Sequence, residues 1–399
     1  MPSYSAIFDH VANLPCVAQV SMGGRGGSDA FHSLFDSHPM VLTFNGQLYF
    51  HTFWLDAVTT AVPEPNLEDI ADEFIGIHID KLKSAYDIVE RKGHLGANMD
   101  QSIDIDLNEF REHTIGLMKN RDLNSKNFMF SVYGAYNLCI GHPIEQTKLL
   151  FHHIHHIRKL PEFLKDFPDS KIISTLRDPR AGYISMVEHA MEGDFPGYHH
   201  VALRRMLEEA LHLISSNGRF CVVRMDDFGN QSIMENVCEW LGIEYNSALE
   251  NSTWGGLRWW GDIKSTVSNI QDEKEFNRAI RGNKWEGKLK GVDRFLFEFL
   301  LEPTFEWYGY ETRKIPAFPG YFMAAILIPW PIWYDRKFLC PTYALPNLKR
   351  GNVRYFLRIC YYYVKRILFY YNLLARRLRG TYTRLPYFTT DGIRKPPVP

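Results

Sequence analysis

A glycine-rich loop between two segments of regular structure constrains this chain most: SMGGRGGSDAFHSLFDSHP, residues 21–39. The short, apolar, proline-free run at residues 16–22 is typical of a buried strand in an α/β sheet. After the loop, apolar residues recur at helical spacing, with Ser28 or Asp29 at the N-cap position. In this order, the N–H groups of the loop and of the helix N-terminus converge on one point, which suits an anion.

The loop alone does not decide between an anion site and a structural turn. It does not match the G-x-x-x-x-G-K-S/T pattern of nucleotide triphosphatases, because no lysine precedes Ser28. The choice therefore depends on what the rest of the chain carries.

A second strand–turn–helix pattern lies in FPDSKIISTLRDPRAGYISMVEHAM, residues 167–191. Residues 171–176 predict a strand, and Pro179 fits the first turn of the following helix, where its missing N–H costs nothing. Arg177 then lies at the carboxyl end of the strand, and Ser185 about two turns into the helix. An arginine and a hydroxyl so placed can bind one phosphate from two sides. The plainer interpretation is an Arg–Asp pair that stabilises the turn and a serine packed on the sheet.

Together these stretches resemble the sulfotransferases that use 3′-phosphoadenosine 5′-phosphosulfate (PAPS). That family has a phosphosulfate loop of the form K/R-S-G-S/T-S/T, and a later arginine and serine that bind the 3′-phosphate. This chain offers residues 25–29 for the loop, and Arg177 and Ser185 for the pair. HSLFDSHP is similar to the HSLLDSHP of many bacterial members, and residues 221–243 resemble the family's R-Y-E-D-L strand and F-L-G-I helix. The resemblance covers roughly residues 12–312.

The resemblance implies an α/β fold, a three-layer parallel sheet with a P-loop-like phosphosulfate loop. It implies PAPS as donor co-substrate and no metal. The donor-binding residues that it implies are Arg25, Gly26, Gly27, Ser28 and Asp29 for the phosphosulfate, Arg177 and Ser185 for the 3′-phosphate, and Arg281 and Lys284 in a basic loop that closes on the donor. For the last two, a solvated helix end is the alternative.

The chain departs from the family pattern at three positions. Asp29 replaces the last hydroxyl of the loop, and a carboxylate beside a phosphosulfate repels it unless it points away. The alternative role for Asp29 is a helix N-cap or a first-turn acid that complements the helix dipole. Ala30 and Met225 replace aromatic residues expected near the adenine, so stacking must come from elsewhere or the donor is held loosely.

Four histidines lie in TKLLFHHIHHIRKLPEFL, residues 147–164. A strand over residues 148–154 directs His153 and His155 to one side and the other two histidines elsewhere. Cytosolic relatives carry a catalytic base histidine 22 residues ahead of the 3′-phosphate arginine, which corresponds here to His155. The unperturbed pKa of histidine suits it to accept a hydroxyl proton near neutrality. His153 is the alternative base if the register differs, and a zinc site or a structural cluster are the other interpretations.

The net charge of −1 hides an asymmetry along the chain. Residues 1–312 hold 29 basic and 44 acidic side chains, whereas residues 313–399 hold 16 and 2. We therefore expect a catalytic domain at 1–312, with a helical insertion at 60–145 that shapes the acceptor site, and a C-terminal tail at 313–399. The six cysteines lack C-x-x-C spacing, which predicts reduced thiols, and the N-terminus predicts no signal peptide.

The tail has the composition of a membrane-interacting segment. Residues 315–334 contain no charge over 20 residues, but their four prolines favour an interfacial or re-entrant segment over a spanning helix. Residues 353–379 predict a basic, aromatic amphipathic helix, typical of a membrane surface. A dimer arm, or a strip packed on the acidic body, is the alternative. We expect a cytoplasmic protein, peripherally associated with the cytoplasmic face of an anionic membrane, and no nucleic-acid partner.

These expectations combine in transfer of a sulfuryl group from PAPS to a hydroxyl or amine of a saccharide, lipid or small alcohol. Arg25 and the backbone of residues 26–28 would hold the phosphosulfate, and His155 would remove the acceptor proton. A glycan or lipid-linked acceptor would suit the tail. The alternatives are a nucleotide-dependent kinase, disfavoured by the missing loop lysine, and a degenerate membrane adaptor, consistent with Asp29 and the missing adenine aromatics.

Overall fold

The centre of the structure is a mostly parallel β-sheet. The computed structural model describes residues 2–21, 26–60, 65–87, 91–192, 219–261, 285–341, 345–346, 353–382 and 384–396. Within them, the strand order is β2 (Val41–Leu42), β3 (Leu149–His156), β1 (Cys16–Ser21), β4 (Lys171–Leu176), β5 (Phe220–Arg224), β8 (Tyr387–Thr389) and β9 (Gly392–Arg394). Each pairing from β2 to β8 is parallel, and β9 is antiparallel to β8. This confirms the predicted α/β class with a parallel sheet.

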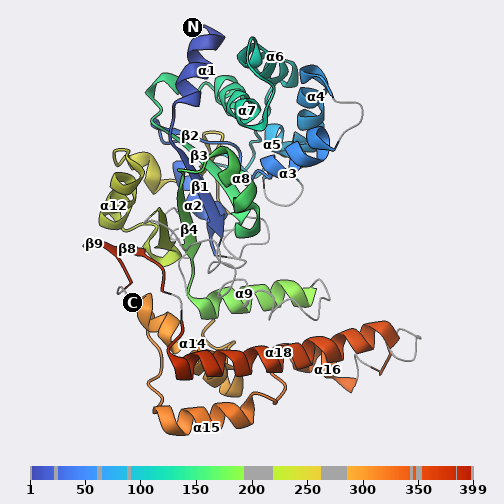
Figure 1. The fold of residues 1–399 in the computed structure, drawn as a ribbon, viewed down its shortest axis with the longest axis vertical. Coiled ribbons are helices and arrows are strands. Elements are labelled where there is room, and N and C mark those ends of the chain that lie inside the picture. The colour runs from blue at the N-terminus through green and yellow to red at the C-terminus, as the bar shows by residue number, and fades with distance from the viewer. Residues whose placement is uncertain are drawn as a thin grey trace.

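The strands of this sheet are apolar because both faces are covered. Every residue of β1 is buried, as in parallel sheets with helices on both sides. Helices α2 (Ser28–Phe35) and α12 (Gln231–Leu241) pack on the sheet, and α8 (Leu160–Asp166) contributes Leu160 and Phe163 to the same hydrophobic core (Figure 1). A short hairpin of β6 (Thr253–Trp254) and β7 (Leu257–Arg258) packs beside α2.

A group of helices lies at one end of the molecule (Figure 1). It comprises α1 (Tyr4–Ala12), α3 (Phe50–Trp54), α4 (Leu67–Ile77), α5 (Ile79–Leu82), α6 (Leu107–Met118) and α7 (Ser125–Cys139). Four of these, α4 to α7, fall within residues 60–145. That this segment shapes the acceptor site stays a proposal.

The opposite end is built from α9 (Pro179–Glu192) and the C-terminal helices (Figure 1). These are α14 (Gly291–Trp307), α15 (Ala317–Leu327), α16 (Trp333–Leu339) and α18 (Val353–Arg379). Tyr183, Ile184 and Val187 of α9 share a second hydrophobic core with them. α18 has the bounds that the sequence pattern predicts. No described helix combines the length and the hydrophobicity needed to cross a bilayer.

One basic residue of the tail, Arg366, is buried in the second hydrophobic core and is not part of the exposed basic surface. Arg366 of α18 is fully buried, and its guanidinium lies 2.8 Å from the Asp335 carboxylate. It also donates to the carbonyl oxygens of Ile328 and Trp330. A buried guanidinium needs such partners, so Arg366 fixes α18 against α15 and α16.

The last described segment returns to the sheet. β8 pairs with β5, with Tyr387 opposite Val222, and Leu385 and Phe388 belong to the main core. The indole N–H of Trp307 donates to the carbonyl oxygen of Leu385 at 2.8 Å. The division of the chain at residue 312 stays a proposal, and a truncation there would remove part of the main core.

Candidate functional site

The glycine loop meets the N-terminus of α2 at the carboxyl ends of β1 and β4. Gly27 is the N-cap, with a left-handed φ of 80° that favours glycine. The predicted N-cap, Ser28 or Asp29, is therefore wrong, because both residues lie in the first turn. The side-chain amide of Gln19 donates to the carbonyl oxygen of Ser28 at 2.7 Å, which fixes the end of the loop to β1.

This loop also lies close to the turn that carries Arg177. Ser21 is opposite Thr175 in the β1–β4 ladder, and a Cβ on Gly26 would lie 3.3 Å from the carbonyl oxygen of Thr175. The loop after β1 and the turn after β4 therefore leave neighbouring strand ends. In open parallel sheets, ligands bind beyond the carboxyl ends of the strands, which is where this loop and this turn lie.

Substituting Gly27 tests how tightly this corner is built. A Cβ there would lie 2.8 Å from the sulfur of Met225, in addition to the left-handed φ. We expect Gly27→Ala to lower the free energy of unfolding by about 2–3 kcal/mol in urea denaturation. Gly242→Ala is the matched control, since Gly242 has a φ of 87° with nothing within 4 Å of its Cβ position. Equal losses of unfolding free energy in the two variants would show that the Met225 side chain moves aside at no cost and that Gly27 is not tightly packed.

Arg177 and Ser185 lie where the sequence predicts. Arg177 directly follows β4, Ser185 lies on α9, and both are half-buried. The Arg–Asp pair of the plainer interpretation exists, but Arg180 makes it: its guanidinium donates to Asp178 at 2.8 Å and to Glu298 of α14 at 2.9 Å. Arg180 thus ties this turn to α14 through Asp178 and Glu298.

His155 reaches the loop through an irregularity in β3. The β1–β3 register shifts between Gln19, opposite His153, and Val20, opposite His155. His155 adopts a φ of 65°, which is rare outside glycine, and its Nδ1 lies 3.2 Å from the Ser28 hydroxyl oxygen. Bulges and strained residues of this kind concentrate at functional sites.

The neighbouring histidines divide between the two faces of β3. His153 faces α2, with its Nδ1 3.3 Å from Nδ1 of His32 and 3.8 Å from a carboxylate oxygen of Asp29. His152 faces α7, where its Nδ1 lies 2.8 Å from the hydroxyl of Tyr133. Complete burial lowers the pKa values of His152 and His153 well below the ordinary value, so both are neutral near pH 7.

The pKa of His155 reflects two opposing influences. Burial lowers it, and the Asp29 carboxylate opposes this shift. Because the net shift is downward from the ordinary value of about 6.5, His155 is predominantly neutral near pH 7. A neutral imidazole beside the start of α2 can accept a proton from a hydroxyl bound there.

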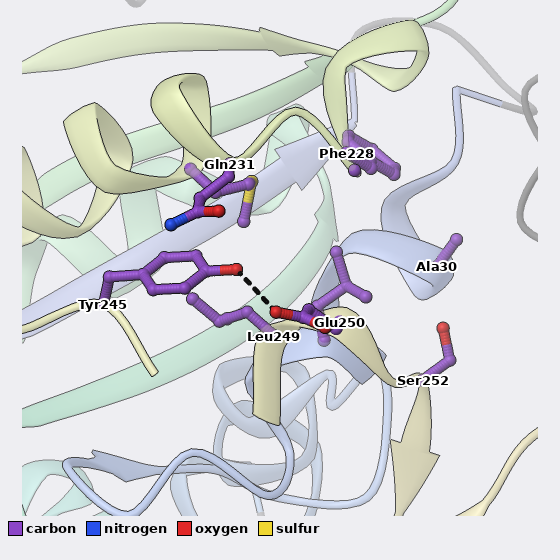
Figure 2. Close-up of a pocket in the computed structure, with 10 residues that line it drawn as sticks. Ala30, Phe228, Gln231, Tyr245, Leu249, Glu250 and Ser252 are labelled. Carbon is purple, nitrogen blue, oxygen red and sulfur yellow. Dashed lines mark hydrogen bonds between the residues drawn. The ribbon is translucent and has the colours of Figure 1, made fainter. Parts of the chain in front are cut away.

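A pocket of about 340 Å³ opens beside α2 (Figure 2). It is lined by Ala30, Leu34, Phe228, Gly229, Gln231, Met234, Tyr245, Leu249, Glu250 and Ser252. The hydroxyl of Tyr245 donates to the Glu250 carboxylate at 3.3 Å, as the dashed line in Figure 2 shows. Ala30 forms part of the wall, so the small side chain that replaces the expected aromatic contributes to the opening. No motif in the sequence pointed to Phe228 or Tyr245 as lining residues.

Three predicted donor residues, Arg25, Arg281 and Lys284, lie outside the described residues. Lys288, from the same basic stretch, forms an ion pair with Glu188 of α9. Across the part of the chain that the structure describes, no group of three or more His, Cys, Asp or Glu residues could hold a metal ion.

A helix N-terminus beside a neutral histidine, at the carboxyl edge of a parallel sheet, is an arrangement that can hold an anion and accept a proton. A sequence model described as "Sulfotransferase family" matches residues 22–247, more than half of the chain. The chain belongs to the sulfotransferase family.

Solved structures similar to this chain are also sulfotransferases. The sulfotransferase domain of the Synechococcus PCC 7002 olefin synthase is 15% identical, with a TM-score of 0.40, covering 75% of this chain and 97% of that domain. The sulfotransferase domain from the curacin biosynthetic pathway is 13% identical, with a TM-score of 0.36 and coverages of 79% and 97%. A Mycobacterium avium sulfotransferase is 12% identical, with a TM-score of 0.32 and coverages of 61% and 67%. No curated protein sequence matches.

Proposed function

We propose that the protein transfers a sulfuryl group from PAPS to a hydroxyl or amine of its acceptor. Family membership supports sulfuryl transfer. The observation that carries the donor assignment is the convergence of the Gly26–Ser28 corner and the Arg177 turn at the ends of two paired strands. Two neighbouring phosphate sites on one sheet edge match a donor that bears a 5′-phosphosulfate and a 3′-phosphate.

In the proposed reaction, the acceptor oxygen attacks sulfur as the bond from sulfur to the phosphate oxygen breaks. Arg25 and the N–H groups at the start of α2 neutralise the charge that develops on the leaving phosphate. His155 accepts the proton of the attacking hydroxyl, which its neutral state permits. Arg177 and Ser185 hold the 3′-phosphate and so fix the donor relative to the base.

We propose that the adenine occupies the pocket beside Ala30. The pocket adjoins α2, and its walls include the rings of Phe228 and Tyr245. Its volume of about 340 Å³ is that of a small-ligand site. These two rings would replace the aromatic residues that the chain lacks at positions 30 and 225.

Calorimetry with two nucleotides tests the donor assignment. We expect 3′,5′-bisphosphoadenosine to bind tightly and ATP weakly, because Arg177 and Ser185 would bind a 3′-phosphate that ATP lacks. Equal affinities would contradict a PAPS site, tighter ATP binding would favour a kinase, and binding of neither would favour a non-catalytic adaptor.

Replacing Arg177 tests its part in this preference. Arg177→Ala should weaken 3′,5′-bisphosphoadenosine binding by about 1.5–3 kcal/mol, the contribution of a charge-assisted contact. Arg219→Ala removes the same charge at the amino end of β5 and should leave the affinity unchanged. An unchanged dissociation constant in a folded Arg177 variant would assign that residue to the turn alone.

The C-terminal helices support a second proposal, peripheral association with the cytoplasmic face of an anionic membrane. Phe318, Phe322 and Ile326 of α15 are 88%, 66% and 58% exposed. Trp330 continues the same four-residue spacing at 59% exposure. A contiguous exposed apolar patch marks an interaction or membrane site. A glycan or lipid-linked acceptor would suit an enzyme held there.

α18 adds positive charge to this surface. The hydroxyl of Tyr371 donates to the carbonyl oxygen of Ala325 at 2.8 Å, which joins α18 to α15. Apart from Asn372, the exposed positions of α18 are apolar, aromatic or basic, and they include Leu357, Tyr361, Leu368, Arg354, Arg358 and Lys365. A second copy of α18 would bring like charges together, whereas an anionic leaflet attracts each basic group by about 1 kcal/mol. Charge therefore favours a membrane over a dimer contact.

A further inference from the structure

The family resemblance implies a hydroxyl residue at position 29, where this chain has Asp29. The contacts of the Asp29 side chain indicate a role for this substitution. Asp29 lies in the first turn of α2, one residue after Ser28. One of its carboxylate oxygens is 3.8 Å from Nδ1 of His153, and the side chain is 29% exposed. The carboxylate is therefore on the β3 side of the helix N-terminus, beside the histidines.

The polar groups near His155 come from two neighbouring elements. Ser28 of α2 contacts His155 directly, and the rings of His153 and His156 of β3 pack beside it. Asp29 and His32 of α2 contact His153, the neighbour of His155. The positive charge of Lys81 of α5 disfavours protonation of His155 and lowers its pKa. Of these described groups, Asp29 is the one that carries a negative charge, and it favours protonation of His155.

We propose that Asp29 is a positioning residue for the base: its carboxylate stabilises the protonated form of His155 during turnover, and it does not bind the donor. This inference rests on the proposed function of His155. Burial disfavours an imidazolium, so a buried histidine needs a nearby negative charge to remain an effective base. Asp29 supplies that charge, and it also repels the phosphosulfate at the same helix end. An aspartate in place of a hydroxyl residue at position 29 thus raises the proton affinity of His155 and lowers the affinity for the donor.

The Asp29→Asn substitution separates these two effects, because it removes the charge and keeps the size. We expect 3′,5′-bisphosphoadenosine to bind about 3- to 10-fold more tightly at low salt, since a like charge is lost. We expect kcat to fall about 3- to 30-fold, because a weaker base accepts the proton less readily. A residue that binds the donor would give the opposite change in affinity.

The pH dependence has a definite sign. Without the carboxylate, the pKa of His155 falls, so the acid limb of the kcat profile moves to lower pH. Proton NMR of the His155 ring, assigned with a His155→Gln variant, should show the same downward shift without any substrate. Asp29→Glu keeps the charge and should restore part of the lost kcat.

Asp69→Asn is the matched control, because Asp69 is a first-turn acid of α4, another helix of the chain. It should leave the His155 titration and the nucleotide affinity unchanged. An unshifted His155 titration in Asp29→Asn, or weaker nucleotide binding, would overturn the proposal. The NMR titration needs no donor, so it decides the role of Asp29 even if wild-type protein binds no 3′,5′-bisphosphoadenosine and the proposed function fails.

Discussion

Replacing His155 with alanine should lower sulfuryl transfer about 10²–10⁴-fold, the range expected for loss of a general base. Binding of 3′,5′-bisphosphoadenosine should persist, because the backbone corner at Gly27 and Ser28 is held by Gln19 and does not need the imidazole. Turnover is measured as release of 3′,5′-bisphosphoadenosine from PAPS with a panel of hydroxyl and amine acceptors, and binding is measured by calorimetry.

Two other histidines serve as controls for this prediction. His152→Ala removes a buried ring on the opposite face of β3 and should lower stability without a comparable loss of turnover in the folded fraction. His153→Ala removes a neighbour of Asp29 and should have an intermediate effect. Full turnover in the His155 variant together with an inactive His153 variant would show that the base is His153, two residues earlier in β3.

Replacing Phe318, Phe322 and Ile326 together with serine should abolish flotation with anionic vesicles. Each large apolar side chain transferred from water contributes about 1.5–3 kcal/mol, so the triple variant should lose at least about 10³-fold in membrane partitioning. All three residues are exposed, and the donor site should therefore keep its nucleotide affinity. Full-length protein is used, because truncation at residue 312 would remove β8 from the sheet.

The matched control replaces three exposed apolar residues at the other end of the molecule. Leu55, Ile77 and Tyr86 are 48%, 52% and 61% exposed, and their replacement with serine should leave flotation unchanged. High salt should weaken wild-type flotation without abolishing it, since apolar burial is not screened. If the wild-type protein does not bind anionic vesicles at low salt and the triple variant changes its oligomeric state, the exposed apolar face of α15 is a subunit contact.

The sequence was most informative where a pattern is local. The strand at residues 171–176 and the helix at residues 353–379 were predicted with the observed bounds, because hydrophobic periodicity alone defines them. The N-cap of α2 was misplaced, because glycine at φ 80° can begin a helix without a side-chain cap. The strand for the histidines was expected to end at residue 154, and it continues to His156.

Features that depend on distant partners could not be predicted. The bulge that directs His155 to Ser28 arises from pairing with β1, which lies more than a hundred residues earlier in the chain. The pocket beside Ala30 is lined by three segments that are distant in the sequence, residues 30–34, 228–234 and 245–252. The contact between Asp29 and His153 likewise exists only once α2 packs on β3. The resemblance to the family pointed to His155, whereas the alternation of the strand alone separated His153 and His155 from the other two histidines and did not choose between them.

The pairing of β8 with β5 affects the order in which this protein can mature. A chain emerging from the ribosome presents β5 with an open edge until residues 387–394 have been made. By then α15 has already emerged with its apolar face. An unpaired strand edge and an exposed apolar face both promote aggregation, and here they exist at the same time. A membrane or a chaperone that covers α15 early would therefore remove one of these two aggregation-prone surfaces while the sheet is still incomplete.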